Sequence, residues 1–231
     1  MPFEKNKIMV LDTETADLNG HVYDVGYTVT DRNGNIETQY NALVDEIFTD
    51  ADKMMGAFYA KKLFSHYAPM LDRGEISLAP WATIIGKMRA DILAHGVTTL
   101  SAYNLAFDRR VMRHTNKLLG GTPIFQSPVK QLCIWRFACE TKLNTRLYKD
   151  LARQMGWVSN AGNLKTGAEY AYRFCRGDWG FIEDHTALSD AQIETAILAD
   201  CFATKKRIPY NHVSDKYANA PWRIVNQKEA S

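Results

Sequence analysis

The sequence predicts an α/β protein, and two features of its pattern lead to that expectation. Near the start of the chain, apolar and polar residues alternate as they do in the strands of a half-buried sheet. From about residue 81 onward, segments with helical spacing alternate with short apolar runs. The chain of 231 residues is 46% hydrophobic, which is enough to bury one large core. We therefore expect one domain over residues 1–205, followed by a polar, extended tail over residues 206–231.

Three strands are expected first, arranged as an antiparallel meander. The apolar run IMVL, residues 8–11, predicts a buried strand. Two alternating segments follow within residues 21–44, and the pair Asn33-Gly34 lies between them. Because this dipeptide is a strong signal for a tight turn, we expect the two segments to form a hairpin.

The later elements are predicted from apolar spacing, helix caps and breakers. Residues 45–80 are interpreted as an insertion, helical over 54–71, and residues 71–81 as a loop. The remaining elements are a helix over 81–94, a strand over 97–103, a helix over 104–119, a strand over 129–135, and helices over 146–157 and 186–205. Asn104 is the expected N-cap of its helix, which Gly120-Gly121 ends.

Two carboxylates follow the first strand directly, in the run VLDTET. Asp12 and Glu14 are two residues apart, so on an extended chain their side chains project from the same face. Like charges held this close are unfavourable unless a cation lies between them. A polar strand end that turns into a loop is the ordinary alternative, and the pair alone does not exclude it.

Two further carboxylates interrupt the apolar faces of helices. Asp108 lies three residues before Val111, on the face that should contact the sheet, and Asp190 repeats this relation in the last predicted helix. Either one alone is explained by the favourable dipole at a helix N-terminus. Buried charges need partners, however, and neither face carries a nearby Lys or Arg. Four carboxylates with hard oxygen ligands predict a pair of Mg²⁺ or Mn²⁺ ions.

One histidine accompanies this acidic set. His185 lies five residues before Asp190, just ahead of the last predicted helix. An imidazole whose pKa is near neutrality can take a proton from an attacking water. A lone histidine before a helix is more often a surface or capping residue, and we interpret the other histidines in that way.

Composition limits the compartment and the class of protein. The four cysteines lie at no zinc-like spacing, so free thiols in a reducing compartment are expected. No apolar run reaches the roughly 18 residues of a membrane span, and residues 1–7 lack the apolar stretch of a signal peptide. We therefore expect a soluble, cytoplasmic protein that does not contact a membrane.

The net charge is only +2, but bases are concentrated in residues 109–153. Only Glu140 and Asp150 oppose the bases of this run, which are Arg109, Arg110, Arg113, Lys117, Lys130, Arg136, Lys142, Arg146, Lys149 and Arg153. A polyanionic partner such as nucleic acid is one interpretation. An ordinary solvated face is the other, because charge alone does not show that these residues cluster in space.

With these residues in place, the sequence resembles the DnaQ-like, DEDDh family of 3′–5′ exonucleases. The family motif D-x-E matches DTET with Asp12 and Glu14, N-x-x-F-D matches NLAFD with Asn104 and Asp108, and H-x-x-x-x-D matches HTALSD with His185 and Asp190. The stretch YKDLARQMGW also resembles a helix that family members carry between the second and third motifs. Each motif is weak alone, but the three in this order are specific, and together they span residues 8–205.

The resemblance implies a ribonuclease H-like fold, a mixed five-stranded sheet with helices on both faces. It implies two Mg²⁺ or Mn²⁺ ions, and release of nucleoside 5′-monophosphates from 3′ ends of DNA or RNA, single-stranded ends being the expected partner. The implied metal ligands are Asp12, Glu14, Asp108 and Asp190, with His185 as the base that activates water. Thr13, Thr15 and Asn104 are expected to contact the terminal nucleotide.

Two departures and two alternatives accompany the resemblance. Asp24-Val25-Gly26 stands where many members have Glu-Ile-Gly, and residues 45–80 are longer than a minimal member's connection. A catalytically weak nucleic-acid-binding or polymerase-associated module of the same fold is one alternative, which the complete set of acidic residues opposes. An RNase H-type endonuclease is the other, but it would not require His185. The sequence leaves open DNA or RNA preference, and whether the protein acts alone, as a homodimer or docked to a polymerase.

Overall fold

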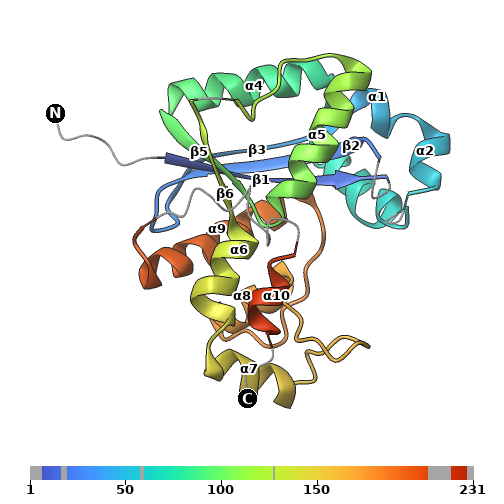
Figure 1. Ribbon diagram of the computed structural model, residues 1–231. Helices are drawn as coiled ribbons and strands as arrows, with labels where there is room; N and C mark the ends of the chain where they lie inside the picture. The colour runs from blue at the N-terminus through green and yellow to red at the C-terminus, as the bar shows by residue number, and fades with distance from the viewer. Residues whose placement is uncertain (1–6, 17–19, 58–59, 127, 208–219, 228–231) are drawn as a thin grey trace.

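The structure, a computed structural model, describes residues 7–16, 20–57, 60–126, 128–207 and 220–227. It is an α/β fold with helices on both faces of one mixed sheet (Figure 1). The strand order is β4-β3-β2-β1-β5-β6. The strands are β1 (Lys7–Thr15), β2 (Val22–Thr30), β3 (Ile36–Val44), β4 (Ser77–Ala79), β5 (Val97–Ala102) and β6 (Lys130–Cys133). The predicted fold class is therefore confirmed.

The predicted strand number is wrong, because the sheet has six strands rather than five. The additional strand is β4, in the stretch 71–81 that we interpreted as a loop. β4 pairs in parallel with the end of β3, and its first two residues are exposed. Three residues at a sheet edge carry too little alternation to be read from sequence.

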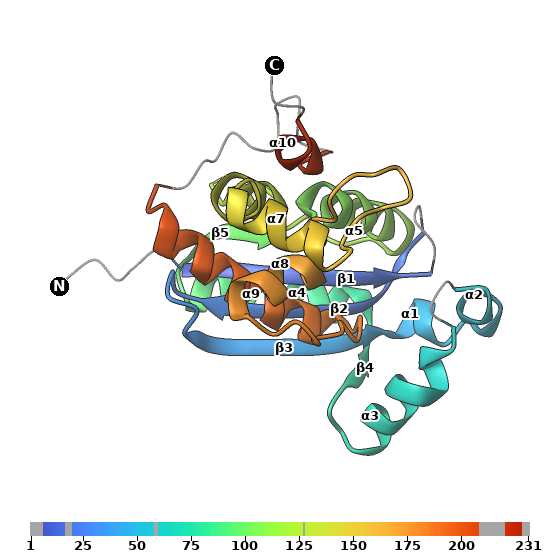
Figure 2. The ribbon, with the colours of Figure 1, turned by 90° about the horizontal axis from the view of Figure 1, so that it is seen from below.

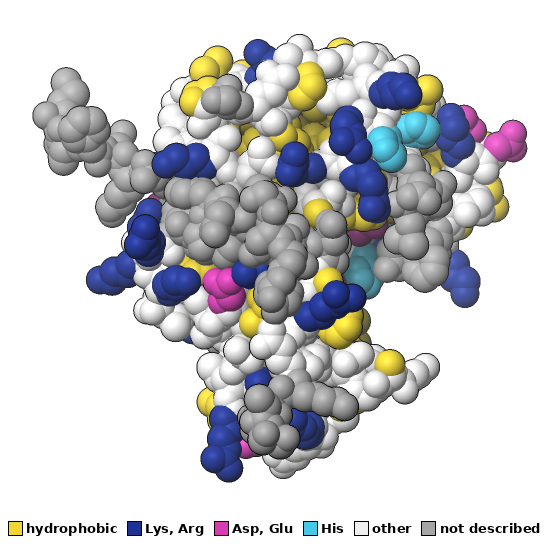
Figure 3. Space-filling view, viewed as in Figure 1, with side chains coloured by type: hydrophobic (Ala, Val, Ile, Leu, Met, Phe, Trp, Pro, Cys, Tyr) yellow, Lys and Arg dark blue, Asp and Glu magenta, His cyan; other side chains and the backbone are white. Residues whose placement is uncertain are grey.

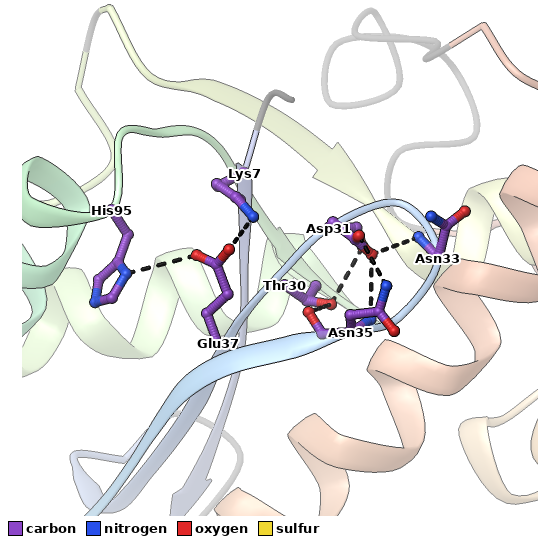
Figure 4. Close-up of polar contacts among 7 residues, drawn as sticks. All are labelled: Lys7, Thr30, Asp31, Asn33, Asn35, Glu37 and His95. Carbon is purple, nitrogen blue, oxygen red and sulfur yellow. Dashed lines mark hydrogen bonds and ion pairs between the residues drawn. The ribbon is translucent and has the colours of Figure 1, made fainter. Parts of the chain in front are cut away.

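The predicted meander and its turn are confirmed. β1 pairs antiparallel with β2, and β2 with β3. In the turn between β2 and β3, the carboxylate of Asp31 accepts hydrogen bonds from the main-chain N–H of Asn33 at 2.7 Å and of Asn35 at 3.1 Å (Figure 4). Gly34 supplies the left-handed conformation, with φ of 83°. In the same view, Glu37 at the start of β3 accepts a hydrogen bond from Lys7 of β1, across the intervening strand β2.

β1 lies at the centre of the sheet and separates two cores. Met9 and Leu11 pack into one core, whereas Ile8 and Val10 pack into the other, because successive side chains point to opposite faces. The parallel pairing of β1 with β5 extends only from Lys7 to Val10. The last residues of β1 therefore keep their partner in β2 but have none in β5, which leaves room for a helix end beside them.

The two cores are covered by different helices (Figures 1 and 2). α4 (Trp81–Ala94) and α5 (Leu105–Leu119) pack on the Met9 side. The Ile8 side is covered by α6 (Ile134–Ala138), the π-helical turn η2 (Cys139–Leu143), α7 (Arg146–Gln154), α8 (Ala168–Arg176) and α9 (Ala187–Thr204). The predicted helices over 81–94, 104–119, 146–157 and 186–205 are confirmed within a few residues.

Three helical segments differ from the prediction. β6 ends at Cys133, so the predicted strand over 129–135 runs two residues into α6. α8 was not predicted, and neither was η2. These pieces are short, and their burial depends on α9, which comes later in the chain.

The insertion, residues 45–80, is helical only in pieces, which are α1 (Asp45–Phe48), α2 (Ala51–Met55), the π-helical turn η1 (Leu63–Tyr67) and α3 (Ala68–Asp72). It lies at one end of the sheet (Figure 2). Tyr67 is 1% exposed, and its ring lies 5.8 Å from that of Tyr23 in β2 and 5.7 Å from that of Phe48. This aromatic cluster fixes the insertion to the end of β2.

Within the predicted tail, the short helix α10 (Trp222–Val225) replaces the expected extended chain. Val225 is buried, and the side-chain carbonyl of Asn226 accepts a hydrogen bond from the main-chain N–H of Leu164 at 2.7 Å. Residues 208–219 and 228–231 lie outside the described residues. All four cysteines are free thiols, as predicted. Among the described helices, none combines the length and apolar character needed to cross a lipid bilayer.

Candidate active site

Asp12 and Glu14 lie at the end of β1, on the face that carries α9. Ile8, Val10, Asp12 and Glu14 are alternate residues of β1, so their side chains point to the same face of the strand, as predicted. Both residues are partly buried. Their cross-strand partners in β2 are Gly26 opposite Asp12 and an acid, Asp24, opposite Glu14. The acidic pair is therefore next to a third carboxylate.

Asp108 reaches the same place from α5. It lies in the first turn of that helix and is 2% exposed. The hydroxyl of Thr13 donates a hydrogen bond to Asp108 Oδ1 at 2.9 Å. Thr13 points to the opposite face of β1 from Asp12, so the strand end contributes to the site from both of its faces.

Asn104 precedes α5 but does not cap it with its side chain. It occupies the N-cap position and is exposed, with no side-chain cap hydrogen bond. Its main-chain carbonyl instead accepts from the N–H of Phe107 at 2.7 Å and of Asp108 at 3.4 Å. Asn104 is thus the N-cap residue, as predicted, but its side chain forms no cap hydrogen bond and is exposed one turn before Asp108. Thr15, by contrast, is buried at the end of β1.

Asp190 approaches from α9, and Gly26 makes that approach possible. A Cβ at Gly26 would lie 2.1 Å from the main-chain nitrogen of Leu188, so no other residue fits between β2 and the start of α9. Asp190 is 5% exposed, and its Oδ1 has no hydrogen-bond partner among the described residues. A buried carboxylate oxygen without a donor requires a positive charge or a proton.

His185 directly precedes Thr186, the N-cap of α9, and is held in a strained conformation. Its φ is 56°, and among the described residues it is the sole non-glycine with positive φ. This conformation costs roughly 1–2 kcal/mol for an L-residue. Its Nδ1 lies 3.6 Å from Glu183 Oε2 and 3.9 Å from Asp190 Oδ2. Ligand-type atoms of Glu14, His185 and Asp190 all lie within 4.8 Å of one another. The predicted histidine therefore does adjoin the carboxylates.

Burial raises the pKa of both carboxyls of the β1 pair. For Asp12, burial acts together with repulsion from Glu194 and the other acids of the site. For Glu14, burial also dominates, although the positive charge of Lys62 opposes it. In both cases the charged form is disfavoured when no cation is bound.

The helix-borne carboxyls show the same direction. Burial raises the pKa of Asp108, against the stabilising hydrogen bond from Thr13. Burial, followed by repulsion from Glu183 and Glu14, raises the pKa of Asp190. The site thus holds more negative charge than its own bases neutralise, which is the condition for binding divalent cations.

Three polar residues of this region were missed by the sequence analysis. Glu194 is 3% exposed and accepts a hydrogen bond from the main-chain N–H of Tyr103 at 2.9 Å. Its position, one turn after Asp190 on the same helix face, was a usable signal. Asp24, which is fully buried, could have been suspected from its place on an alternating strand. Lys62 lies in the insertion, where no pattern in the sequence marks it.

The basic run over 109–153 is partly paired within itself. Arg136 Nε lies 2.7 Å from Glu140 Oε1. Arg146 Nε and Arg153 Nη1 each lie 3.5 Å from a carboxylate oxygen of Asp150. Figure 3 shows Lys and Arg side chains dispersed over one face of the molecule, several of them near histidine side chains. Both interpretations of the run therefore stay predictions.

No protein-family model matches the sequence, and no curated protein matches it either. Solved structures do match. Exonuclease I from Methylocaldum szegediense has a TM-score of 0.56 at 15% identity, over 90% of this chain and 42% of that one. E. coli exonuclease I in complex with a 5cy-dT13 oligonucleotide has a TM-score of 0.56 at 13% identity, over 88% and 42%. Exonuclease X in complex with 5′ overhanging duplex DNA has a TM-score of 0.48 at 20% identity, over 87% and 93%.

The chain spans less than half the length of the exonuclease I chains that it matches. At these identities the likeness concerns the fold. The strand that we did not predict, β4, lies at the edge of the sheet. The chain therefore shares its fold with the matched part of these exonuclease I structures.

Proposed function

We propose that this protein is a metal-dependent 3′–5′ exonuclease that removes nucleoside 5′-monophosphates from the 3′ end of DNA or RNA. One observation carries the proposal. Four carboxylates from three separate elements, Asp12 and Glu14 of β1, Asp108 of α5 and Asp190 of α9, converge at one end of the sheet beside His185. The fold shared with exonuclease I supports it.

The residues of the site fit divalent cations. The available donors are carboxylate oxygens, which suit Mg²⁺ or Mn²⁺, and Asp190 Oδ1 is buried without a hydrogen-bond partner among the described residues. We infer that Asp12, Glu14, Asp108 and Asp190 hold two such ions. Bound cations would supply charge that polarises the scissile phosphate and assists water activation.

His185 is the residue that we propose takes a proton from the attacking water. Carboxylates of Glu183 and Asp190 lie on the Nδ1 side of its ring, which favours the proton on Nδ1 and leaves Nε2 as the acceptor. Burial, and then the positive charge of Lys62, lower the pKa of His185 below its usual value. The ring is therefore neutral, and able to accept a proton, near neutral pH.

The remaining proposed contacts concern the strand end and the start of α5. Thr15 directly follows Glu14, and the exposed Asn104 precedes Asp108 by four residues, so both are proposed to contact the terminal nucleotide. Thr13 has its hydroxyl directed at Asp108, so we propose that it acts on substrate through that carboxylate. A single-stranded 3′ end suits the site, because the last phosphodiester must reach buried carboxylates.

The test is digestion of matched, 5′-labelled single-stranded DNA, duplex DNA and RNA with Mg²⁺ or Mn²⁺. The proposal expects shortening by single nucleotides from the 3′ end, release of 5′-monophosphates, and loss of activity with chelator and in Asp108→Asn. Fragments cut at internal positions would instead identify an endonuclease. Binding of the oligonucleotide without cleavage in any metal would identify a catalytically weak binding module.

A further inference from the structure

We propose that Lys62 of the insertion is a positioning residue, which holds the His185 turn over the carboxylates. This inference rests on the proposed function and extends it, because it assigns a role in the site to residues 45–80. The Nζ of Lys62 donates a hydrogen bond to the main-chain carbonyl of His185 at 2.6 Å. The two residues are 123 positions apart in the sequence. Lys62 is 9% exposed, whereas its neighbour Lys61 is exposed.

The contact of Lys62 is directed at the strained residue itself. A residue with φ of 56° persists only when its surroundings fix it. His185 precedes Thr186, the N-cap of α9, so its carbonyl lies outside the hydrogen bonds of the helix, and the lysine supplies a donor for it. The backbone of His185 is thus held from outside its own element.

A second contact from the same segment holds the other side of this turn. The hydroxyl of Tyr67 donates to Asp24 Oδ2 at 2.9 Å, and that oxygen also accepts from the main-chain N–H of Ala187 at 3.0 Å. Lys62 directly precedes η1 and Tyr67 is its last residue, so this short turn contacts the chain before Thr186 directly and after it through Asp24. Two contacts fix a direction as well as a distance, which a single surface contact would not do.

Lys62 is buried among acidic side chains. Burial lowers the pKa of Lys62, and the nearby carboxylates of Glu14, Asp190, Asp184 and Asp24 oppose this effect. The long side chain of a lysine is able to reach from the insertion to the carbonyl of His185. Lys62 does not need to touch substrate to affect the reaction. It acts through His185.

The test compares Lys62→Met, Lys62→Arg and the matched control Lys61→Met in the full chain. For Lys62→Met we expect kcat on a single-stranded oligonucleotide to fall at least about tenfold with KM within about twofold, because a misplaced base loses rate rather than affinity. Lys62→Arg should recover part of the rate, and Lys61→Met should retain all of it. The imidazole NMR signals of His185 should shift in Lys62→Met but not in Lys61→Met.

Other outcomes overturn the inference. Unchanged kcat and unchanged His185 signals in Lys62→Met show that the lysine has no positioning role. Loss of kcat together with a weaker Mn²⁺ affinity by calorimetry assigns Lys62 to the metal site instead. If Lys62→Met does not fold, Tyr67→Phe removes the second contact without a change in charge, and unaltered His185 signals there count against the proposal. A wild-type protein with no exonuclease activity refutes the proposed function, while the NMR comparison still tests Lys62.

Discussion

Thr13 and Asp108, which lie 95 residues apart in the sequence, are joined by a hydrogen bond of 2.9 Å between the hydroxyl and Oδ1. This bond connects the strand that carries Asp12 and Glu14 to the helix that carries Asp108. It also favours the charged form of Asp108 against the effect of burial. The orientation of one proposed metal ligand thus depends on a residue that points away from the other two.

Thr13→Val is expected to weaken metal binding and activity while the protein stays folded. Valine has the same shape but cannot donate, so Asp108 loses a bond of the charge-assisted type, which contributes about 1.5–3 kcal/mol. We expect kcat/KM to fall about tenfold or more and the Mn²⁺ affinity by calorimetry to fall with it. Thr13→Ser keeps the hydroxyl and is the matched control. Equal Mn²⁺ affinity in the valine and serine variants would contradict this role.

His185→Asn tests the proposed base without adding backbone strain, because asparagine tolerates positive φ better than alanine. The rate should fall by roughly 10²- to 10⁴-fold, the range for loss of a positioned acid or base. The acid limb of the wild-type pH-rate profile should lie below about pH 6.5, the ordinary value for histidine, and should be absent from the variant. His95→Asn is the control, since His95 lies beside Glu37 at the opposite end of the strands (Figure 4). Loss of metal binding in His185→Asn would make this residue a ligand.

The metal-free protein is expected to lose stability as the pH rises. Burial raises the pKa of Glu14 to about 8, of Asp108 to about 7 and of Asp190 to about 9, against about 4 in an unfolded chain. The folded state therefore binds more protons than the unfolded state in this range, so the free energy of unfolding falls with increasing pH. Thermal melts in chelator should give a Tm that decreases between about pH 5 and about pH 9.

Addition of Mg²⁺ should reverse this trend, because the cations replace the protons. The rise in Tm on adding Mg²⁺ should be largest at the alkaline end of the range. Asp108→Asn, which cannot ionise, should reduce both the loss of Tm with pH and the gain with Mg²⁺. A metal-free Tm that increases with pH over the same interval would show that these carboxyls are already neutralised in the folded protein.

Gly26→Ala should displace the start of α9 and inactivate the protein. The added Cβ would lie 2.1 Å from the main-chain nitrogen of Leu188 and 2.3 Å from the carbonyl carbon of Ala187, and main-chain atoms of a helix cannot give way cheaply. Overpacking of this kind costs about 1–3 kcal/mol or more. Gly86→Ala is the matched control, because Gly86 is exposed within α4 and its Cβ would meet nothing within 4 Å.

The two alanine variants should move the Tm in opposite directions. Gly86→Ala should stabilise the protein by about 0.5–1 kcal/mol through helix propensity and leave activity unchanged. Gly26→Ala should lower both Tm and the affinity for Mn²⁺, since Asp190 is displaced with the helix. A Gly26→Ala protein with wild-type Tm and Mn²⁺ affinity would show that α9 does not depend on this close approach.

Much of the fold could be predicted from the sequence because local patterns determine it. The alternation on β2 and β3, the turn at Asn33-Gly34 and the apolar faces of α5 and α9 are properties of neighbouring residues. The short elements β4, η2 and α8 were not predicted, because their stability comes from partners distant in the chain. The exposed side chain of Asn104 shows the same limit, since a suitable residue at an N-cap need not form the cap.

The chemical identity of the candidate site follows from the order of residues along the chain. Asp108 and Asp190 stand out in the sequence because they interrupt apolar helix faces, and Asp12 and Glu14 because they bring like charges together at a strand end. How these carboxylates meet depends on the tertiary structure, since the pairing of β1 with β5 ends at Val10 and α9 crosses β2 at Gly26. The tertiary structure also adds Glu194 and Lys62 to the site. Lys62 and His185 are 123 residues apart, so their contact depends on the path of the whole chain. Such a contact produces no periodic pattern from which it could be predicted.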